Sequence, residues 1–185
     1  MGPGPPERAV PPEATSFARL PAMAPAHSAY TLRPATRADG DFASRVKLAG
    51  LRAYLEPVPG FDADRLRRQY QADFAPTEAR IVVVGEADVG VLRVVDREGA
   101  VFLAEIYLVP DAQGRGIGSR VITDVIRKAH GRGRAVRLQL LRPNPARRLY
   151  ERLGFRLHGE TSTHFRMELP PPPGAPDSLD ASPGA

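Results

Sequence analysis

A short run of small and polar residues could bind an anion. The sequence QGRGIG (residues 113–118) follows an apolar segment that Pro110 ends, and it precedes a helical pattern that starts at Ile117. Small residues allow successive backbone N–H groups to point at one ligand, and a helix N-terminus adds positive potential. The run predicts a pyrophosphate-binding turn, with an ordinary tight turn as the alternative. It is neither a Rossmann fingerprint, because position 119 is Ser, nor a P-loop, because no Gly-Lys-Ser/Thr follows.

A second segment, residues 144–155, shows clear helix punctuation and carries a candidate acid. Asn144 is expected to be the N-cap, Pro145 the first helical residue and Gly154 the left-handed stop. Tyr150 shares a helical face with Ala146 and with two leucines, so its spacing alone fits a core residue as well as a proton donor. The spacing leaves both roles open.

Basic residues concentrate around these two segments. Between residues 115 and 156 there are eleven Arg and one Lys against Asp124 and Glu151, a net charge of about +10 in a chain whose formal total is +5. This distribution favours an anionic, nucleotide-like ligand, although two solvated arginine-rich helices would give the same count. Nucleic acid is not expected as a partner, because no recognition module and no interleaved aromatic residues accompany the charge.

The remaining pattern predicts the elements that position these segments. A strand at 30–34 is followed by a helix to residue 56, which Asp39 or Asp41 can cap, and by a second helix at 62–74. Three strands at 80–84, 89–95 and 101–108 form an antiparallel meander. The helix from Ile117 carries an apolar stripe and an expected Asp124–Lys128 pair, and the strand at 136–141 follows as a right-handed crossover. Strands at 155–159 and 163–169 close the domain.

Together these segments resemble the paired signature of the GNAT superfamily of acetyl-CoA-dependent N-acetyltransferases. The resemblance rests on LAEIYLVPDAQGRGIGSRVI followed by LRPNPARRLYERLGF and covers roughly residues 30–169. It implies an α/β fold with a mixed, mostly antiparallel sheet of six or seven strands, splayed in the middle and flanked by about four helices. The activity that it implies is direct attack of a primary amine on acetyl-CoA, with no metal needed.

The resemblance also assigns roles to residues. Main-chain groups of Ile106, Tyr107 and Leu108 would hold the pantetheine and thioester, with the Leu108 amide polarising the acetyl carbonyl. Asn144 would contact the pantetheine arm, and the Tyr150 hydroxyl would act as general acid toward the CoA thiolate. The turn residues expected at the pyrophosphate are Gln113, Gly114, Arg115, Gly116, Ile117, Gly118 and Ser119.

The base and the acceptor pocket are less well defined. Glu105 could take the amine proton, directly or through water, if it faces the cleft, and otherwise it would form an ion pair with a neighbouring Arg. His164 lies on the less apolar face of the last strand and is a candidate for substrate binding or proton relay. The candidate walls of the acceptor site come from the first two helices and their connection: Tyr54, Glu56, Phe61 and Tyr70. A small-molecule amine is favoured over a protein N-terminus or lysine, and a non-catalytic acetyl-CoA sensor is the other alternative.

Composition sets the remaining limits. The 185 residues include no Cys, which excludes disulfides, a thiolate nucleophile and Cys-ligated zinc. Proline-rich segments at 1–28 and 170–185 are expected to be disordered tails around a domain at 29–169, and Met23 is an alternative start. With no apolar run of membrane-spanning length and no signal peptide, a cytoplasmic protein without membrane contact is expected, and a homodimer stays open.

Overall fold

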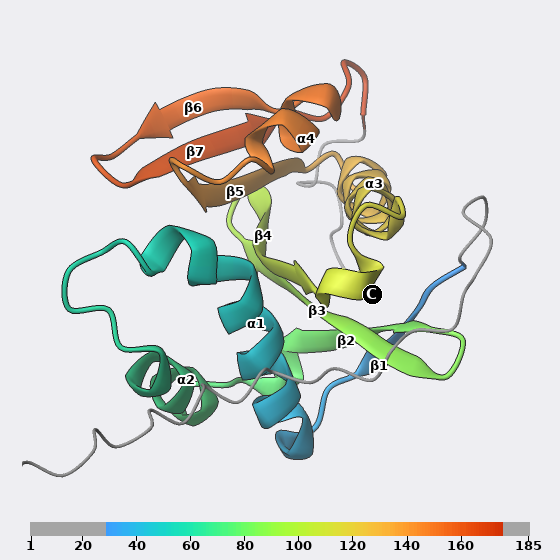
Figure 1. Cartoon of the computed structure of the whole chain (residues 1–185). Coiled ribbons are helices and arrows are strands. Elements are labelled where there is room, and N and C mark those ends of the chain that lie inside the picture. The colour runs from blue at the N-terminus through green and yellow to red at the C-terminus, as the bar shows by residue number, and fades with distance from the viewer. Residues whose placement is uncertain (1–28, 176–185) are drawn as a thin grey trace, which may run out of the picture.

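The computed structural model describes residues 29–175. They form a seven-stranded sheet with four helices and three short 3-10 turns (Figure 1). The elements are β1 Thr31–Pro34, η1 Arg37–Asp39, α1 Gly40–Leu55, α2 Ala63–Ala72, η2 Pro76–Glu78, β2 Ala79–Val84, β3 Ala87–Arg97, β4 Ala100–Leu108, η3 Pro110–Ala112, α3 Ile117–His130, β5 Ala135–Leu141, α4 Arg147–Arg152, β6 Arg156–Glu160 and β7 His164–Leu169. The predicted mixed sheet, the helix count and the element order are confirmed.

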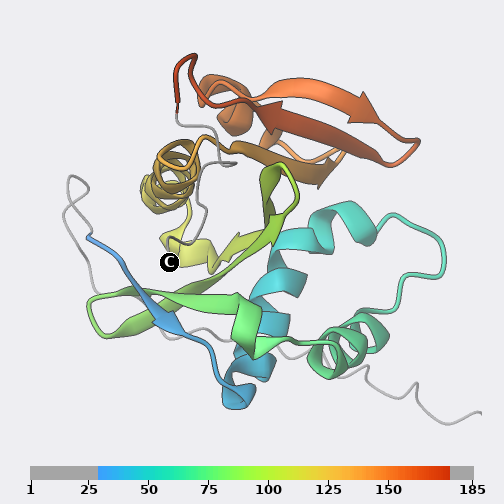
Figure 2. The ribbon, with the colours of Figure 1, turned by 180° about the vertical axis from the view of Figure 1, so that it is seen from behind.

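The sheet has the strand order β1-β2-β3-β4-β5-β7-β6. All neighbours are antiparallel except β4 and β5, which the α3 crossover joins in parallel. Viewed from behind, β1 and β2 lie at the opposite end of the molecule from β6 and β7 (Figure 2). The β4–β5 pairing therefore connects the two halves of the sheet.

This connection is short, and the two strands separate beyond it. Parallel pairing runs from Ala100↔Ala135 to Leu103↔Leu138, whereas β4 continues to Leu108 and β5 to Leu141. The register between β3 and β4 shifts at the same point: Val94 lies opposite Leu103 and Arg93 opposite Glu105, which leaves Ala104 as the extra residue of a bulge. Since a bulge bends its strand, it gives a local cause for the separation.

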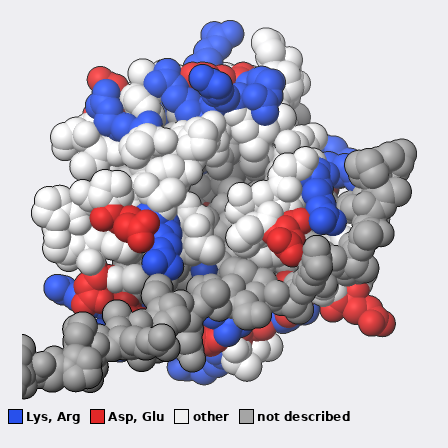
Figure 3. Space-filling view, viewed as in Figure 1, with Lys and Arg blue, Asp and Glu red and all other residues white. Residues whose placement is uncertain are grey.

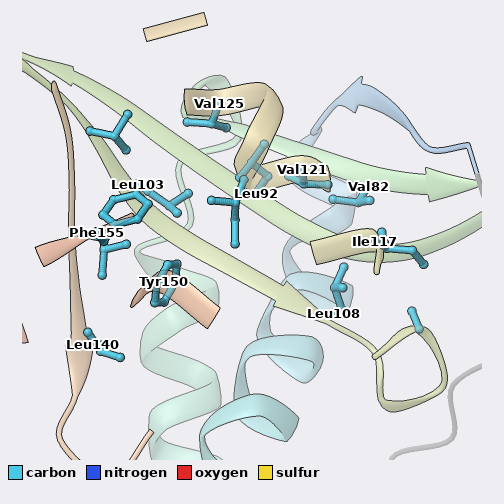
Figure 4. Close-up of a cluster of buried hydrophobic side chains, with 14 of the residues drawn as sticks. Val82, Leu92, Leu103, Leu108, Ile117, Val121, Val125, Leu140, Tyr150 and Phe155 are labelled. Atoms are coloured by element: carbon cyan, nitrogen blue, oxygen red, sulfur yellow. The ribbon is translucent and has the colours of Figure 1, made fainter. Parts of the chain in front are cut away.

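Helices cover both faces of the sheet. α3 and α4 pack on one face, where the stripe predicted for α3 is buried against Val82, Leu92, Leu103 and Leu108 (Figure 4). α1 and α2 cover the other face, where Ala43, Ala79 and Val91 form a smaller buried cluster. The predicted stripe is confirmed by its burial: Ile117, Val121, Ile122, Val125 and Ala129 are all at most 9% exposed, and Ile126 is partly buried against the same cluster.

Two local predictions are wrong. Asp39 precedes α1 but makes no side-chain cap bond to it, because its carboxylate accepts from the Thr36 N–H at 2.7 Å and from Arg33. Asp124 does not pair with Lys128; it accepts from Arg127 Nη2 at 2.6 Å and from the Tyr30 hydroxyl. The competing donors to Asp39, Thr36 and Arg33, are near it in sequence. Of the donors to Asp124, Arg127 is near in sequence and Tyr30 is brought close by the fold.

The predictions for residues 1–28 and 176–185 lie outside the described residues. Within residues 29–175, no helix is both long enough and apolar enough to cross a bilayer.

Candidate active site

A cavity of about 520 Å³ lies where β4 and β5 separate. We call it cavity A. It is lined by the end of β4 (Ile106 to Leu108), by the turn before α3 and by the segment that leads into α4. Another cavity, of about 560 Å³ between α3 and β3, contains none of the predicted site residues. The separation of the strands thus creates space next to both segments that the sequence singles out.

The turn at 113–118 presents its backbone toward cavity A. Gly114 and Gly116 have φ angles of +72° and +77°, which favour glycine, and α3 begins directly afterwards. The first amide to donate within the helix is that of Arg120, to the Gly116 carbonyl at 3.1 Å, so the amides of Ile117, Gly118 and Ser119 have no acceptor in the helix itself. Gly114, Gly116, Gly118 and Ser119 line the cavity, whereas the side chain of Ile117 is buried in the core and Arg115 is not part of the lining.

Gln113 ties this turn to the end of β4. Its side-chain amide donates to the Leu108 carbonyl at 2.9 Å, and its backbone N–H donates to Pro110 at 3.0 Å. On the other edge of β4, the Val109 N–H donates to Val89 at 2.9 Å. Because N–H groups alternate along a strand, the Leu108 N–H points to the opposite edge, into the gap. Gln113 thereby fixes the strand end whose amide faces cavity A.

Asn144 and Tyr150 complete the far wall. The Asn144 Oδ1 atom accepts from the Ala146 N–H at 2.9 Å, which leaves its side-chain N–H groups available, and the helix itself begins later than predicted, at Arg147. Gly154 ends it with φ +93°, as expected. The Tyr150 ring stacks edge-on against Phe155, with centroids 5.6 Å apart, and is 7% exposed. Burial raises the pKa of Tyr150 to about 12, so its hydroxyl stays protonated near neutrality.

A smaller cavity of about 270 Å³, which we call cavity B, adjoins the first. The two share the lining residues Ile106, Tyr107, Asn144 and Tyr150. Glu105 lines cavity B and is 8% exposed. The Ala104 bulge explains why Glu105 faces this cavity. Leu103 packs on the α3 side of the sheet, whereas Glu105, two residues later, contacts residues of α1 and α2 on the other side.

Three donors surround the Glu105 carboxylate. Oε1 accepts from Lys47 Nζ at 2.8 Å and lies 3.7 Å from Arg93 Nη1, while Oε2 accepts from the Tyr70 hydroxyl. Lys47 Nζ also lies 3.9 Å from the centre of the Tyr70 ring. Glu105 therefore both faces a cavity and forms an ion pair, so the two alternatives that the sequence left open coexist. Burial and the Glu105 charge raise the pKa of Tyr70, so this hydroxyl remains a donor.

The structure distributes the predicted acceptor residues unevenly. His164 lines cavity B, with its Nδ1 atom 2.8 Å from the Thr163 hydroxyl, and Tyr54 lines cavity A. Phe61 and Glu56 line neither cavity. Tyr70 is also absent from both linings, because its hydroxyl is turned to Glu105, and it supports that residue from behind. Neither Phe61 nor Tyr70 therefore forms part of the wall of cavity A or cavity B.

Several residues near the site were not singled out from sequence. A Cβ atom at Gly90 would lie 2.5 Å from the Tyr107 carbonyl, and one at Gly50 would lie 2.8 Å from the Tyr107 ring. Both glycines permit close packing around the end of β4. Lys47 and Arg93 hold Glu105 but come from α1 and β3. An isolated Lys on an otherwise Arg-rich helix was the available signal for Lys47.

Comparison with known proteins relates part of this arrangement to one family. Residues 77–157 match the family model described as the acetyltransferase (GNAT) domain. Over these residues the chain is similar to a GNAT acetyltransferase domain. The matched segment includes β4, the 113–118 turn, the β4–β5 junction and α4. No curated protein matched the chain.

Solved structures agree with the GNAT fold. An N-acetyltransferase from Staphylococcus aureus Mu50 is 12% identical with a TM-score of 0.60, and the alignment covers 75% of this chain and 100% of that one. The PaiA N-acetyltransferase from Thermoplasma acidophilum, solved with coenzyme A, is 13% identical with a TM-score of 0.60 over 77% and 99%. An acetyltransferase from Thermus thermophilus is 21% identical with a TM-score of 0.59 over 76% and 96%. At these identities the likeness concerns the fold.

Proposed function

We propose that this protein transfers the acetyl group of acetyl-CoA to a primary amine of a small molecule, by direct attack within a ternary complex. The observation that carries the proposal is the pair of adjoining cavities at the β4–β5 separation, with Tyr150 at their junction. Cavity A has the anion-binding turn at one end and the Leu108 N–H beside it. Cavity B has a carboxylate, Glu105, on its wall.

The residues present fit acetyl-CoA in cavity A. The amides of residues 114–119, at a helix N-terminus with two positive-φ glycines, suit a pyrophosphate. Main-chain groups of Ile106 and Leu108 that have no partner on β5 suit an amide-bearing arm, and the Asn144 side-chain N–H groups lie on the opposite wall. When bound, acetyl-CoA supplies an activated acetyl group as a thioester.

The chain's own residues then divide the chemistry. The Leu108 N–H donates to the acyl carbonyl oxygen, where negative charge develops. Glu105 accepts a proton from the incoming ammonium group, directly or through water, so that a neutral amine attacks. Tyr150, which burial keeps protonated, donates to the sulfur as the C–S bond breaks, and it regains a proton from the nitrogen of the new amide, directly or through water. Holding both reactants at the shared wall of the two cavities supplies much of the acceleration.

Thiol release in the presence of a broad panel of amines tests the proposal. Amine-dependent release of free CoA, with the acetylated amine found by mass spectrometry, is the expected result. Tight binding of acetyl-CoA with no amine-dependent release across the panel would overturn the transferase proposal and favour a sensor. Transfer only to protein N-termini or lysines would overturn the small-molecule acceptor.

A further inference from the structure

Four leucines line cavity B without serving the core. Leu51 and Leu55 come from α1, Leu66 from α2 and Leu141 from the end of β5. All four are partly exposed, and none belongs to either buried hydrophobic cluster or packs against one. We call them the leucine wall. Single exposed leucines are common on protein surfaces, but four that converge on one cavity form a local apolar surface.

The lining of cavity B has unequal numbers of acidic and basic side chains. Among its lining residues within 29–175, Glu105 is an acid and no Lys or Arg is present. The cations that neutralise Glu105 reach it from outside this lining, since neither Lys47 nor Arg93 lines the cavity. His164 also lines the cavity, and its imidazole provides a titratable nitrogen. A bound ammonium group would meet a carboxylate here, whereas the lining holds no Lys or Arg for a carboxylate on the same molecule.

The surface around the site shows the same contrast. In Figure 3, Lys and Arg gather over the end of the molecule that β6 and α4 occupy, while the centre of this face, where α1, β4 and α3 converge, is mostly uncharged. None of the Arg residues of the 115–156 segment, and not Lys128, lies on the wall of cavity B.

From these observations we infer that the acceptor is an apolar primary monoamine, an alkylamine or arylalkylamine with no carboxylate beside the amino group. The inference rests on the proposed acetyl transfer and names its acceptor class. The amino group lies at Glu105 and the hydrocarbon part against the leucine wall. The volume of about 270 Å³ is near the lower end of small-molecule pockets, roughly 300 Å³, and limits the acceptor to a compact molecule.

A matched series of amines tests the acceptor class. Propylamine, butylamine and pentylamine add methylene groups one at a time, 1,5-diaminopentane places a second charge at the far end of the same chain, and norleucine is pentylamine with a carboxylate beside the amine. We expect kcat/KM to rise about 3- to 4-fold per methylene. We also expect pentylamine to exceed 1,5-diaminopentane and norleucine by at least about tenfold each. Equal or better turnover of either charged analogue would overturn the inference and leave acetyl transfer intact.

Substitution of the wall separates recognition from folding. Leu66→Gln should lower kcat/KM for pentylamine about tenfold and reduce its advantage over 1,5-diaminopentane, with the affinity for CoA unchanged. Leu157→Gln is the matched control, because Leu157 is 49% exposed on β6 and lines neither cavity. Unchanged selectivity in a folded Leu66→Gln protein would contradict the role of the wall.

Amine binding to the CoA complex provides a readout that does not need turnover. If no amine is acetylated, the proposed function fails, and calorimetry of the same amines still tests the cavity. Tighter binding of pentylamine than of 1,5-diaminopentane and norleucine supports the inference. No binding of any of the three, or preferential binding of a charged analogue, overturns it.

Discussion

At the residue scale, Tyr150 combines burial with access to both cavities. Its pKa of about 12 keeps the hydroxyl protonated at every ordinary assay pH. Tyr150→Phe removes the donor but keeps the ring that stacks on Phe155. We expect kcat to fall about 10²- to 10⁴-fold with the CoA dissociation constant within about threefold of wild type. Steady-state kinetics and CoA titration measure the two effects, and a variant as fast as wild type would remove the acid role.

The Lys47–Glu105 ion pair is also a residue-scale feature, and it is testable through stability. Both side chains are largely buried, at 21% and 7% exposure. Among residues 29–175, Lys47→Met leaves Arg93 and Tyr70 as the partners of the Glu105 carboxylate. We therefore expect the free energy of unfolding to fall by about 2 to 3 kcal/mol. Adding Glu105→Gln should restore part of this loss, which a double-mutant cycle in urea would measure.

The control for this pair is a similar pair on the surface. Arg52 and Glu56, four residues apart at the end of α1, are 48% and 61% exposed. Arg52→Met should change the free energy of unfolding by less than about 1 kcal/mol. A loss as large as that of Lys47→Met would show that the buried pair has no special weight.

At the element scale, the entry to α3 should matter for binding beyond its cost in stability. Gly116 and Gly85 both have positive φ, at +77° and +62°, and a Cβ atom at either would meet nothing within 4 Å. Gly116→Ala and Gly85→Ala should therefore each lower the free energy of unfolding by about 1 to 2 kcal/mol. Only Gly116→Ala should weaken CoA binding, by about tenfold, because a change of the backbone angles at residue 116 would reorient the amides of the 113–118 turn. Equal CoA affinity in the two variants would contradict the anion-binding role.

The elements themselves could be predicted because their signals are local. The α3 stripe repeats at helical spacing, and Gly154 ends α4 with the left-handed φ expected of a stop signal. The direction in which Glu105 points depends on the Ala104 bulge, which breaks the alternation that a sequence argument assumes. The Tyr70–Glu105 bond and the close approach of Gly90 to Tyr107 join separate elements, so no local pattern reports them.

At the scale of the whole molecule, one ionic cluster connects the edge strand to the rest of the fold. Arg33 of β1 donates to Asp39, before α1, at 2.6 Å and to Asp88 of β3 at 2.6 Å. The hydrogen bonds from Arg33, followed by those from Thr36, lower the pKa of Asp39 to about 2. The Arg33 cluster thus joins two strands and the start of a helix.

This cluster predicts acid sensitivity with a definite sign. Because the folded pKa of Asp39 is depressed, the stabilisation is complete above the ordinary pKa near 4 and is lost as pH falls toward 2. Asp39→Asn should lower the free energy of unfolding by about 2 kcal/mol at pH 7 and flatten its fall between pH 4 and 2. Asp41→Asn is the control, because the Asp41 carboxylate is half exposed beside Arg45. It should change the free energy of unfolding at pH 7 and its fall between pH 4 and 2 only a little. A wild-type acid limb in the Asp39→Asn protein would contradict this assignment.

The short parallel seam between β4 and β5 has a consequence for solvent exchange. Beyond the Leu103↔Leu138 pair, the amides of Ile106 and Leu108 on the gap side of β4 have no strand partner, while Val109 donates to Val89 on the other edge. Deuterium should therefore enter Ile106 and Leu108 much faster than it enters Val109. Added CoA should slow exchange at the first two and leave the third unchanged, so alternate amides of a single strand would report whether the gap is filled.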